Sequence, residues 1–497
     1  MVIAMPTILS PNGNPVRVGQ VILRTPGLQG VANSYRQGSP DMRAAERTTD
    51  ALEQALKNQN VQSQETIEIS AAREVPVSNI PTRSTTFDEP AIVADVPEPG
   101  DEFGQFVLYT DESGVTTWNF ALDRNDQIDV TRGSGKRTYI IPRSVPPTEG
   151  TAESRSLIGV AGKKLLKVVV FPLVDPTLGK VGDYFVGKWE RKNRQSRIRP
   201  FGPENYCVPD APSLQAKDWI ALANGRALLL VHGTFSSTHA AFSQMPKGYV
   251  DTLNQRYQGR VFAFDHFTLS EDPTANVEWF LEQMPKGITL DLDIICHSRG
   301  ALVSRVLAER KVLSGRCSTR VRKVVFVGAP NGGTILTDTK YMGCFLDSYT
   351  NILNLFLDLL PETGVVETLD CVITVAKQLS LNTIKGLEGL QSMLPNGKFL
   401  KALNQGGKDD KEYFSISSDF EPRHNPGLKV YAANRLMDKV FHAGNDLVVP
   451  TASAYEKNGS GFFPIEDRYL FPRPDAVHHC NYFAQAVARE KILHWLS

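Results

Sequence analysis

The C-terminal part of the chain predicts an α/β fold with a doubly wound, mostly parallel sheet, and a smaller β-rich domain is expected before it. The segments Arg226–Val231 and Val321–Val327 are apolar runs suited to strands buried on both faces. Between them, the run Leu292–Cys296 leads into a tight turn and an apolar helical segment. Strands that alternate with helices in this way indicate a parallel sheet whose loops gather at the carboxyl ends of the strands.

Residues 1–145 are expected to form the β-rich domain, with one helix. A capped start at Ser39–Glu46, followed by apolar positions at helical spacing that include Leu52 and Leu56, predicts the helix. Two strand-like runs flank the turn Asp111–Gly114 and indicate a hairpin. The strands expected in this domain are Thr66–Ser70, Phe106–Tyr109, Val115–Phe120 and Thr138–Ile141.

Residues 146–214 are expected to form a helical connector. Its two helices are predicted at Leu165–Phe171 and Tyr184–Arg194, and Pro200–Pro203 leads into the next domain. The α/β domain is predicted to span residues 215–497.

The most informative segment is Cys296-His297-Ser298-Arg299-Gly300. A serine between a strand and a helix can form a nucleophile elbow, in which the serine backbone is strained and large side chains two places away would collide. The usual pattern is therefore Gly-x-Ser-x-Gly; here Gly300 fits and Cys296 replaces the first glycine. The helix that follows would aim its N-terminal amides at an anion formed beside Ser298. The alternative is a buried turn without chemistry.

The loop after Arg226–Val231 begins His232-Gly233-Thr234-Phe235. A glycine there lets the backbone approach a ligand closely. In acyl-transfer enzymes of this architecture, an amide from such a loop completes the oxyanion hole. We expect this donor to be Thr234, or failing that Phe235, beside the amide of Arg299. The alternative is an ordinary turn at the end of a strand.

An acid and a base candidate follow later in the chain. Asp446 lies in a Gly-Asn-Asp turn before a short apolar segment that is expected to be a strand, and a carboxylate there can orient a histidine and stabilise its cationic form. His478 and His479 come just before the C-terminal helix. The resulting order of serine, aspartate and histidine differs from the orders of chymotrypsin and subtilisin.

Taken together, the segments around His232, Ser298, Asp446 and His479 resemble those of an α/β-hydrolase of the bacterial lipase/esterase kind, close to its lipase-like (PGAP1-like) branch. The resemblance covers roughly residues 215–497, and it also draws on Gly328-Ala329-Pro330-Asn331-Gly332-Gly333-Thr334. It implies that Ser298 is the nucleophile, Asp446 the orienting acid and a histidine the base. Such enzymes often carry His-x-Asn-Tyr-Phe, which selects His479 over His478. Cys296 departs from the family pattern at the position where glycine is usual.

The remaining cysteine and histidine residues give no sign of a metal site. Cys296 is interpreted as a small buried hydrophobe rather than a second nucleophile, and His297 is expected to pack at, or line, the mouth of the site. No Cys-x-x-Cys, His-Glu-x-x-His or phosphate-binding glycine loop occurs, so we expect no cofactor, no catalytic metal and no nucleotide chemistry. A calcium or zinc ion held by carboxylates distant in sequence would leave no local signature. Histidines without metal-ligand spacing are His239, His266, His424, His442 and His494.

Charge and composition limit the partners. Lys+Arg and Asp+Glu both number 54 in 497 residues, so no global charge draws the chain to nucleic acid or to a membrane. The segment Lys188–Arg199 has six basic side chains against the single acid Glu190, which indicates a solvated helix end or a peripheral contact for anionic lipid head groups. Scattered cysteines, no N-terminal signal and no 18-residue apolar run lead us to expect a soluble, cytoplasmic protein; export that needs no cleaved signal would escape this reasoning.

A helical insertion is predicted at residues 335–410, and it is far longer than an ordinary connection. Long insertions in compact domains tend to be functional lids. We expect this one to cover Ser298, so that Leu355 and Phe356 join Phe235 and His297 as substrate-binding residues. The alternative is a helical subdomain with a core of its own.

The sequence therefore predicts a serine hydrolase that acts on carboxylic esters, with lipid-like or medium to long acyl groups. A phospholipase, a thioesterase or an amidase would use the same residues. An alternative of another class is a non-catalytic binding or scaffold protein of the same fold, with the β-rich domain as its functional part. Retention of nucleophile, acid, base and both oxyanion segments favours the enzyme, since a scaffold needs none of them.

Overall fold

The computed structural model describes most of the chain. The described residues are 6–36, 50–75, 91–122, 135–143, 163–175, 179–180, 185–309, 318–355, 362–405, 411–422, 434, 437–438, 440–456 and 463–497. The chain forms two compact units. Unit 1 comprises Met1–Val181, Val372–Thr383 and Pro426–Leu436, and unit 2 comprises Gly182–Cys371, Ile384–Asn425 and Met437–Ser497.

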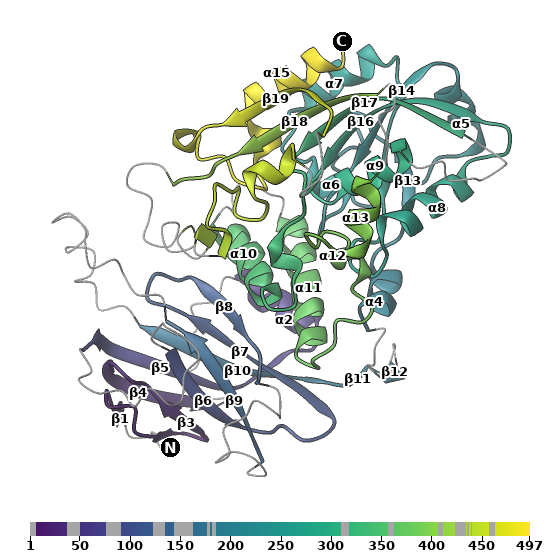
Figure 1. Cartoon of the computed structure of the whole chain (residues 1–497). Coiled ribbons are helices and arrows are strands. Elements are labelled where there is room, and N and C mark those ends of the chain that lie inside the picture. The colour runs from purple at the N-terminus through teal and green to yellow at the C-terminus, as the bar shows by residue number, and fades with distance from the viewer. Residues whose placement is uncertain are drawn as a thin grey trace. The chain divides into compact units, whose positions relative to one another are not determined.

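Unit 1 is built mainly from two antiparallel sheets, which confirms the expected β-rich N-terminal part (Figure 1). Their strand orders are β1-β4-β5-β10-β7-β8 and β2-β3-β6-β9. Buried residues from both sheets, such as Leu23 and Ile67, belong to one hydrophobic core. The elements are β1 Thr7–Ile8, β2 Val16–Val18, β3 Val21–Arg24, β4 Leu28–Arg36, α2 Asp50–Asn58, β5 Gln62–Glu74, β6 Ala91–Pro97, β7 Phe103–Thr110, β8 Thr116–Asn119, β9 Lys136–Pro142, β10 Lys164–Pro172, β11 Val174–Asp175 and β12 Gly179–Lys180.

The predicted hairpin of unit 1 is confirmed. Strands β7 and β8 pair antiparallel on either side of Asp111–Gly114. The Asp111 carboxylate closes the turn by accepting the backbone N–H of Ser113 at 2.9 Å and of Val115 at 3.0 Å. The predicted helix is present as α2, whereas its expected start at Ser39–Glu46 lies outside the described residues.

The prediction of a helix at Leu165–Phe171 is wrong. This segment lies in strand β10, which pairs with β5 on one side and β7 on the other. Four successive β-branched or aromatic residues, Val168–Phe171, and the short length of the run favour a strand. The second predicted connector helix does form, as α4 (Phe185–Asn193).

Unit 2 contains the predicted sheet, with the strand order β13-β15-β14-β16-β17-β18-β19. Only β13 is antiparallel to its neighbour, and the other pairings are parallel. The strands are β13 Arg197–Pro200, β14 Arg226–Val231, β15 Val261–Asp265, β16 Thr289–His297, β17 Ser318–Val327, β18 Glu412–Ser418 and β19 Ile465–Phe471. Because β14, β16 and β17 are parallel neighbours, the segments that follow them meet at one edge.

Helices cover both faces of this sheet (Figure 1). Side chains of successive strand residues point to opposite faces. Leu228 and Leu230 of β14 belong to the same core cluster as residues of α7 (Lys247–Arg256) and α15 (Ala486–Trp495). Phe262 of β15 lies on the other face, where it contacts Trp219 of α5 (Ala216–Ala223) and Phe280 of α8 (Pro273–Gln283). The sheet is therefore doubly wound, as predicted.

The segment between β17 and β18 is helical, as predicted. Its elements are η1 Ile335–Thr337, α10 Met342–Leu355, α11 Glu362–Leu379, α12 Glu388–Gln391 and α13 Lys398–Asn404. The last part of α11 belongs to unit 1, where the Lys377 ammonium donates to the backbone carbonyl of Gln59 at 2.8 Å. Across the described residues, no helix has the length and apolar character needed to cross a membrane.

Candidate functional site

Ser298 occupies a strained turn between β16 and α9 (Gly300–Glu309). Its φ is +52°, in the left-handed region. Residues other than glycine adopt this region at a cost of about 1–3 kcal/mol, and such strain is common at functional sites. The turn is held by hydrogen bonds from the Ser298 N–H to the Val327 carbonyl and from the Ala301 N–H to the Ser298 carbonyl, both 2.9 Å.

Two glycines allow this turn to pack closely against the end of β14. A Cβ atom on Gly300 would lie 2.5 Å from the backbone oxygens of both Val231 and His232. A Cβ atom on Gly233 would lie 2.5 Å from the Ser298 Cβ and 3.1 Å from its Oγ. The loop that begins at His232 therefore lies directly against the serine.

Cys296 is accommodated where glycine is usual in such turns. It is fully buried in β16, and its thiol donates to the Val325 carbonyl at 3.5 Å. Burial raises the pKa of this thiol, which keeps it protonated. The side chain behaves as a small buried residue.

His479 and Asp446 form a buried hydrogen-bonded pair. The distance from His479 Nδ1 to Asp446 Oδ2 is 2.8 Å. Oδ2 also accepts the Tyr482 hydroxyl at 2.9 Å, and Oδ1 accepts the N–H groups of Val448 at 3.1 Å and Val449 at 2.7 Å. Burial alone would raise the pKa of Asp446, but His479 and these hydrogen bonds outweigh it and hold the pKa below its ordinary value. Asp446 is thus an ionised carboxylate.

The strand expected after Asp446 does not form. Within this segment, Asn445 and Pro450 make a single antiparallel bridge. Val448 and Val449 turn around the Asp446 carboxylate instead, because that buried charge needs their amides as donors. Leu447 adopts a φ of +77° within this turn.

The second ring nitrogen of His479 has no protein partner in the part of the chain that the structure describes. Asp446 is ionised and can only accept, so Nδ1 of a neutral His479 ring carries the proton. Nε2 then presents a lone pair, and this atom is buried and without a hydrogen bond. A buried, oriented and unpartnered imidazole nitrogen is suited to take a proton from a substrate or a neighbouring hydroxyl.

His297 connects His479 to the serine turn. Its Nε2 donates to the backbone carbonyl of His479 at 2.8 Å, and the two ring centroids are 4.8 Å apart. Burial, then the proximity of His479, lowers the pKa of His297 to about 3. His297 is adjacent to Ser298 in sequence, so this contact brings His479 near the serine turn. The expected role of His297 in substrate binding stays a prediction.

His478 makes different contacts. Its Nδ1 accepts the backbone N–H of Cys480 at 3.3 Å, and its ring lies edge-on to Phe420. The ring is completely buried, and burial lowers its pKa to about 3. Of the two adjacent histidines, His479 is the one that is bonded to Asp446.

The amides of Thr234 and Arg299 have no hydrogen-bond acceptor among the described residues. The Thr234 hydroxyl faces the sulfur of Met393 at 3.8 Å, and Phe235 adopts a φ of +59°. The Arg299 guanidinium is buried and turned to other partners, with Nε donating to the Gly389 carbonyl at 2.8 Å and a terminal nitrogen to Asn276 at 3.0 Å. Burial lowers the pKa of Arg299 to about 10. Arg299 can therefore serve the site through its backbone.

The insertion supplies a residue that the sequence did not single out, Tyr349 of α10. Its ring lies edge-on to His479, with centroids 6.2 Å apart, and edge-on to Phe235 at 4.8 Å. Burial raises the pKa of Tyr349 well above its ordinary value, and a hydrogen bond with the Ser298 side chain opposes this shift. Phe345, one turn earlier, contacts both Tyr349 and Phe235.

Leu355, expected to bind substrate, is the last residue of α10, and Phe356 lies outside the described residues. Sequence reasoning also missed the role of Tyr482. A usable signal existed there, because Tyr482 follows His479 by three residues in the same predicted motif. No local signal marks Tyr349.

Among the described residues, no three His, Cys, Asp or Glu side chains are grouped so as to hold a metal ion.

A family model described as a domain of unknown function (DUF7379) matches residues 193–497, more than half of the chain. The chain belongs to this family. No curated protein matches the DUF7379 chain.

The DUF7379 chain is also distantly similar in structure to lipases over about half of its length. Lipase 1 from Pelosinus fermentans is 12% identical, with 54% of this chain and 98% of that chain covered and a TM-score of 0.36. The mature lipase BlEst2 from Bacillus licheniformis is 15% identical, with 51% and 87% covered and a TM-score of 0.29. The phospholipase PlaB from Legionella pneumophila is 13% identical, with 55% and 60% covered and a TM-score of 0.33. At such identity the likeness concerns the fold alone.

The packing of the serine turn in this DUF7379 protein gives a first prediction. Gly300→Ala should destabilise unit 2 by about 1–3 kcal/mol, because the new methyl group meets two backbone oxygens that cannot move freely. The measurement is the thermal or denaturant midpoint. Gly248→Ala in α7 is the matched control: a Cβ there meets nothing within 4 Å, and alanine is favoured over glycine in a helix by up to about 1 kcal/mol. Equal midpoints for the two variants would contradict the steric argument.

Proposed function

We propose that the chain is a serine hydrolase that cleaves carboxylic esters through an acyl-enzyme intermediate. The observation that carries this proposal is the buried Asp446–His479 hydrogen bond, which His297 links to the left-handed strand-to-helix turn of Ser298. The unpartnered Nε2 of His479 is compatible with this role, since a general base needs a ring nitrogen that is not already bonded to the protein.

In the proposed mechanism, Ser298 Oγ attacks the ester carbonyl carbon while His479 Nε2 accepts the hydroxyl proton. Asp446 holds the ring in the required tautomer and stabilises the imidazolium. The imidazolium then returns the proton to the alkoxy leaving group, which departs as an alcohol. Water, deprotonated by the same nitrogen, attacks the acyl-serine carbonyl. The imidazolium then returns this proton to Ser298 Oγ as the acyl–oxygen bond breaks and the carboxylic acid leaves.

The oxyanion formed in both steps would accept hydrogen bonds from the backbone N–H groups of Thr234 and Arg299. Removal of one such donor typically lowers kcat by about 10²–10³-fold. The close packing of the Gly233 backbone against Ser298, which leaves no room for a Cβ atom, and the position of Arg299 directly after the serine support these two donors.

We further propose that the substrates are lipid-like esters with medium or long acyl groups, and that the insertion serves as a lid. Support comes from the aromatic side chains of α10: Phe345 and Tyr349 pack on Phe235, and the Tyr349 ring lies edge-on to His479. Apolar and aromatic linings with few polar groups are typical of sites for apolar ligands.

The nucleophile is tested by covalent labelling. A fluorophosphonate probe should label the wild-type chain, and Ser298→Ala should abolish labelling because only this hydroxyl can carry the phosphonyl group. The variant should keep the thermal midpoint of the wild type. A folded Ser298→Ala protein that is still labelled would rule out Ser298 as the nucleophile.

The two adjacent histidines form a matched pair of variants. His479→Ala should lower kcat by about 10³-fold or more, whereas His478→Ala should lower it by about tenfold or less. The reason is that His479 alone of the two is bonded to Asp446. Steady-state kinetics on a p-nitrophenyl ester give both values, and a reversed ranking would transfer the proposed role to His478.

The substrate class is tested by varying the acyl chain. If the acyl group is buried, each methylene contributes about 0.8 kcal/mol, so kcat/KM should rise from acetyl through hexanoyl to decanoyl p-nitrophenyl esters. Measurements are made below substrate aggregation, with Ser298→Ala as the background rate. A flat or falling series would limit the proposal to small esters and leave the hydrolytic mechanism intact.

A further inference from the structure

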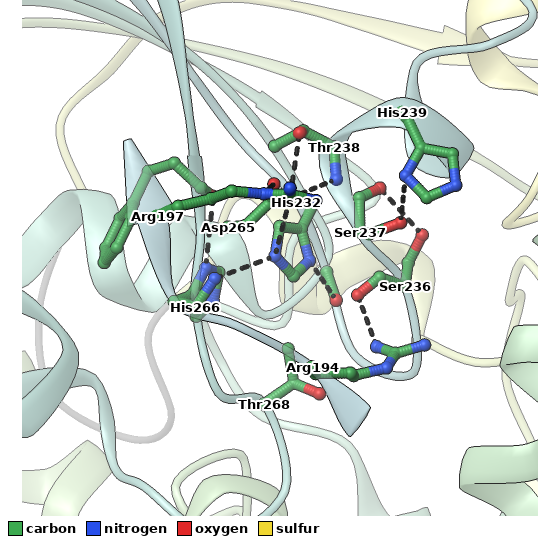
Figure 2. A network of polar contacts seen from close by, with 12 residues as sticks. Arg194, Arg197, His232, Ser236, Ser237, Thr238, His239, Asp265, His266 and Thr268 are labelled. Atoms are coloured by element: carbon green, nitrogen blue, oxygen red, sulfur yellow. Dashed lines mark hydrogen bonds and ion pairs between the residues drawn. The ribbon is translucent and has the colours of Figure 1, made fainter. Parts of the chain in front are cut away.

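The loop that follows β14 is held by a buried polar network (Figure 2). His232, its first residue, is 1% exposed, and its ring lies against that of His266, with centroids 4.3 Å apart and the planes tilted by 31°. Farther along the loop, Asp265 accepts both the backbone N–H and the hydroxyl of Thr238, at 2.7 and 2.8 Å. Arg194 donates to the backbone carbonyls of Phe235 at 3.0 Å and Ser236 at 2.6 Å. The loop is thus fixed at its start, middle and end.

The contacts of His232 determine its tautomer. The backbone N–H of His266 points at His232 Nε2 at 3.2 Å, and a backbone N–H can only donate. Burial lowers the pKa of His232 to about 4, against the opposing effect of Asp265, so the ring is neutral near pH 7. A neutral ring whose Nε2 accepts must carry its proton on Nδ1. That proton is donated to the Gly233 carbonyl, 2.9 Å away.

The hydrogen bond to the Gly233 carbonyl also orients the next amide. Gly233 C=O and Thr234 N–H belong to one planar peptide group, in which a trans peptide bond points them in opposite directions. With the carbonyl held toward the His232 ring, the Thr234 N–H points away from that ring. The backbone of Gly233 lies against Ser298, and the Thr234 amide has no acceptor among the described residues.

We propose that His232 is a positioning residue for the reaction: its Nδ1–H fixes the Gly233–Thr234 peptide so that the Thr234 amide faces the oxyanion formed at Ser298. This inference rests on the proposed function and adds a residue that does not itself touch substrate. Without the imidazole donor, the peptide group can rotate and the Thr234 N–H is no longer held in the direction of the oxyanion.

The test compares His232→Asn with His232→Leu. The two replacements are similar in size, so the cavity beside His266 is similar in both, but only asparagine can donate to the Gly233 carbonyl. His232→Leu should lower kcat on a p-nitrophenyl ester by about 10²-fold, with KM changed by less than about threefold, because an oxyanion contact acts in the transition state. His232→Asn should recover kcat to within about tenfold of the wild type.

His266→Phe is the matched control. It retains an aromatic ring beside His232 and the backbone N–H that His232 accepts. Of the two ring nitrogens it removes, Nε2 has no partner among the described residues, and Nδ1 makes one long contact, 3.4 Å, with the Phe264 carbonyl. Its kcat should stay within about threefold of the wild type. Thermal midpoints of all three variants separate loss of folding from loss of orientation.

The outcomes separate this inference from the proposed function. An active, fluorophosphonate-labelled wild type with equal kcat for His232→Asn and His232→Leu would overturn the role of His232 and leave the hydrolase intact. A folded wild type that is neither labelled nor active would overturn both. If neither variant folds, ¹⁵N NMR of the histidine rings in the wild type decides: a proton on Nδ1 of His232 supports the inference, and a proton on Nε2 overturns it.

Discussion

The close approach of α9 to the end of β14 is the contact on which the candidate site depends. Gly300 makes it possible, because any side chain at this position would collide with the carbonyls of Val231 and His232. The same approach brings Ser298 against Gly233 and forces the serine backbone into the left-handed region. The serine hydroxyl, the first amides of α9 and the loop after β14 are thereby gathered at one edge of the parallel sheet, where the carboxyl ends of the strands also meet.

The candidate site at this edge of the sheet is buried, so each of its charged groups needs hydrogen-bond partners within the protein. A buried carboxylate without partners costs several kcal/mol, and Asp446 avoids the cost with two backbone amides, the Tyr482 hydroxyl and His479. The same hydrogen bonds set the direction of the His479 ring. Removal of one of these partners would leave the Asp446 carboxylate with an unmet hydrogen bond. Substitutions of residues that contact Asp446 are therefore expected to affect both folding and chemistry. Stability measurements therefore accompany the kinetic tests.

The insertion is packed into the site rather than appended to the sheet. The Arg299 side chain binds the Gly389 carbonyl of α12, Met393 faces the Thr234 hydroxyl, and the Tyr349 ring of α10 lies edge-on to that of His479. These contacts join the insertion to both proposed oxyanion segments. A movement of α10 or α12 would consequently alter the surroundings of the serine, which is the physical basis for the proposed lid.

The sequence by itself determined the α/β character of the C-terminal part, the strands around the serine, the tight turn at Ser298 and the preference for His479, because these features are expressed in periodicity, turn residues and short motifs. Tertiary structure decided the rest. The strand at Leu165–Phe171 forms because β5 and β7 pair with it. The segment at Val448 forms a turn rather than a strand, because the Asp446 carboxylate accepts the Val448 N–H. Tyr349 lies edge-on to His479, which is 130 positions farther along the chain. Local patterns record which residues are buried and where the backbone turns, whereas contacts between distant segments depend on how helices and strands pack, which no short window of sequence contains.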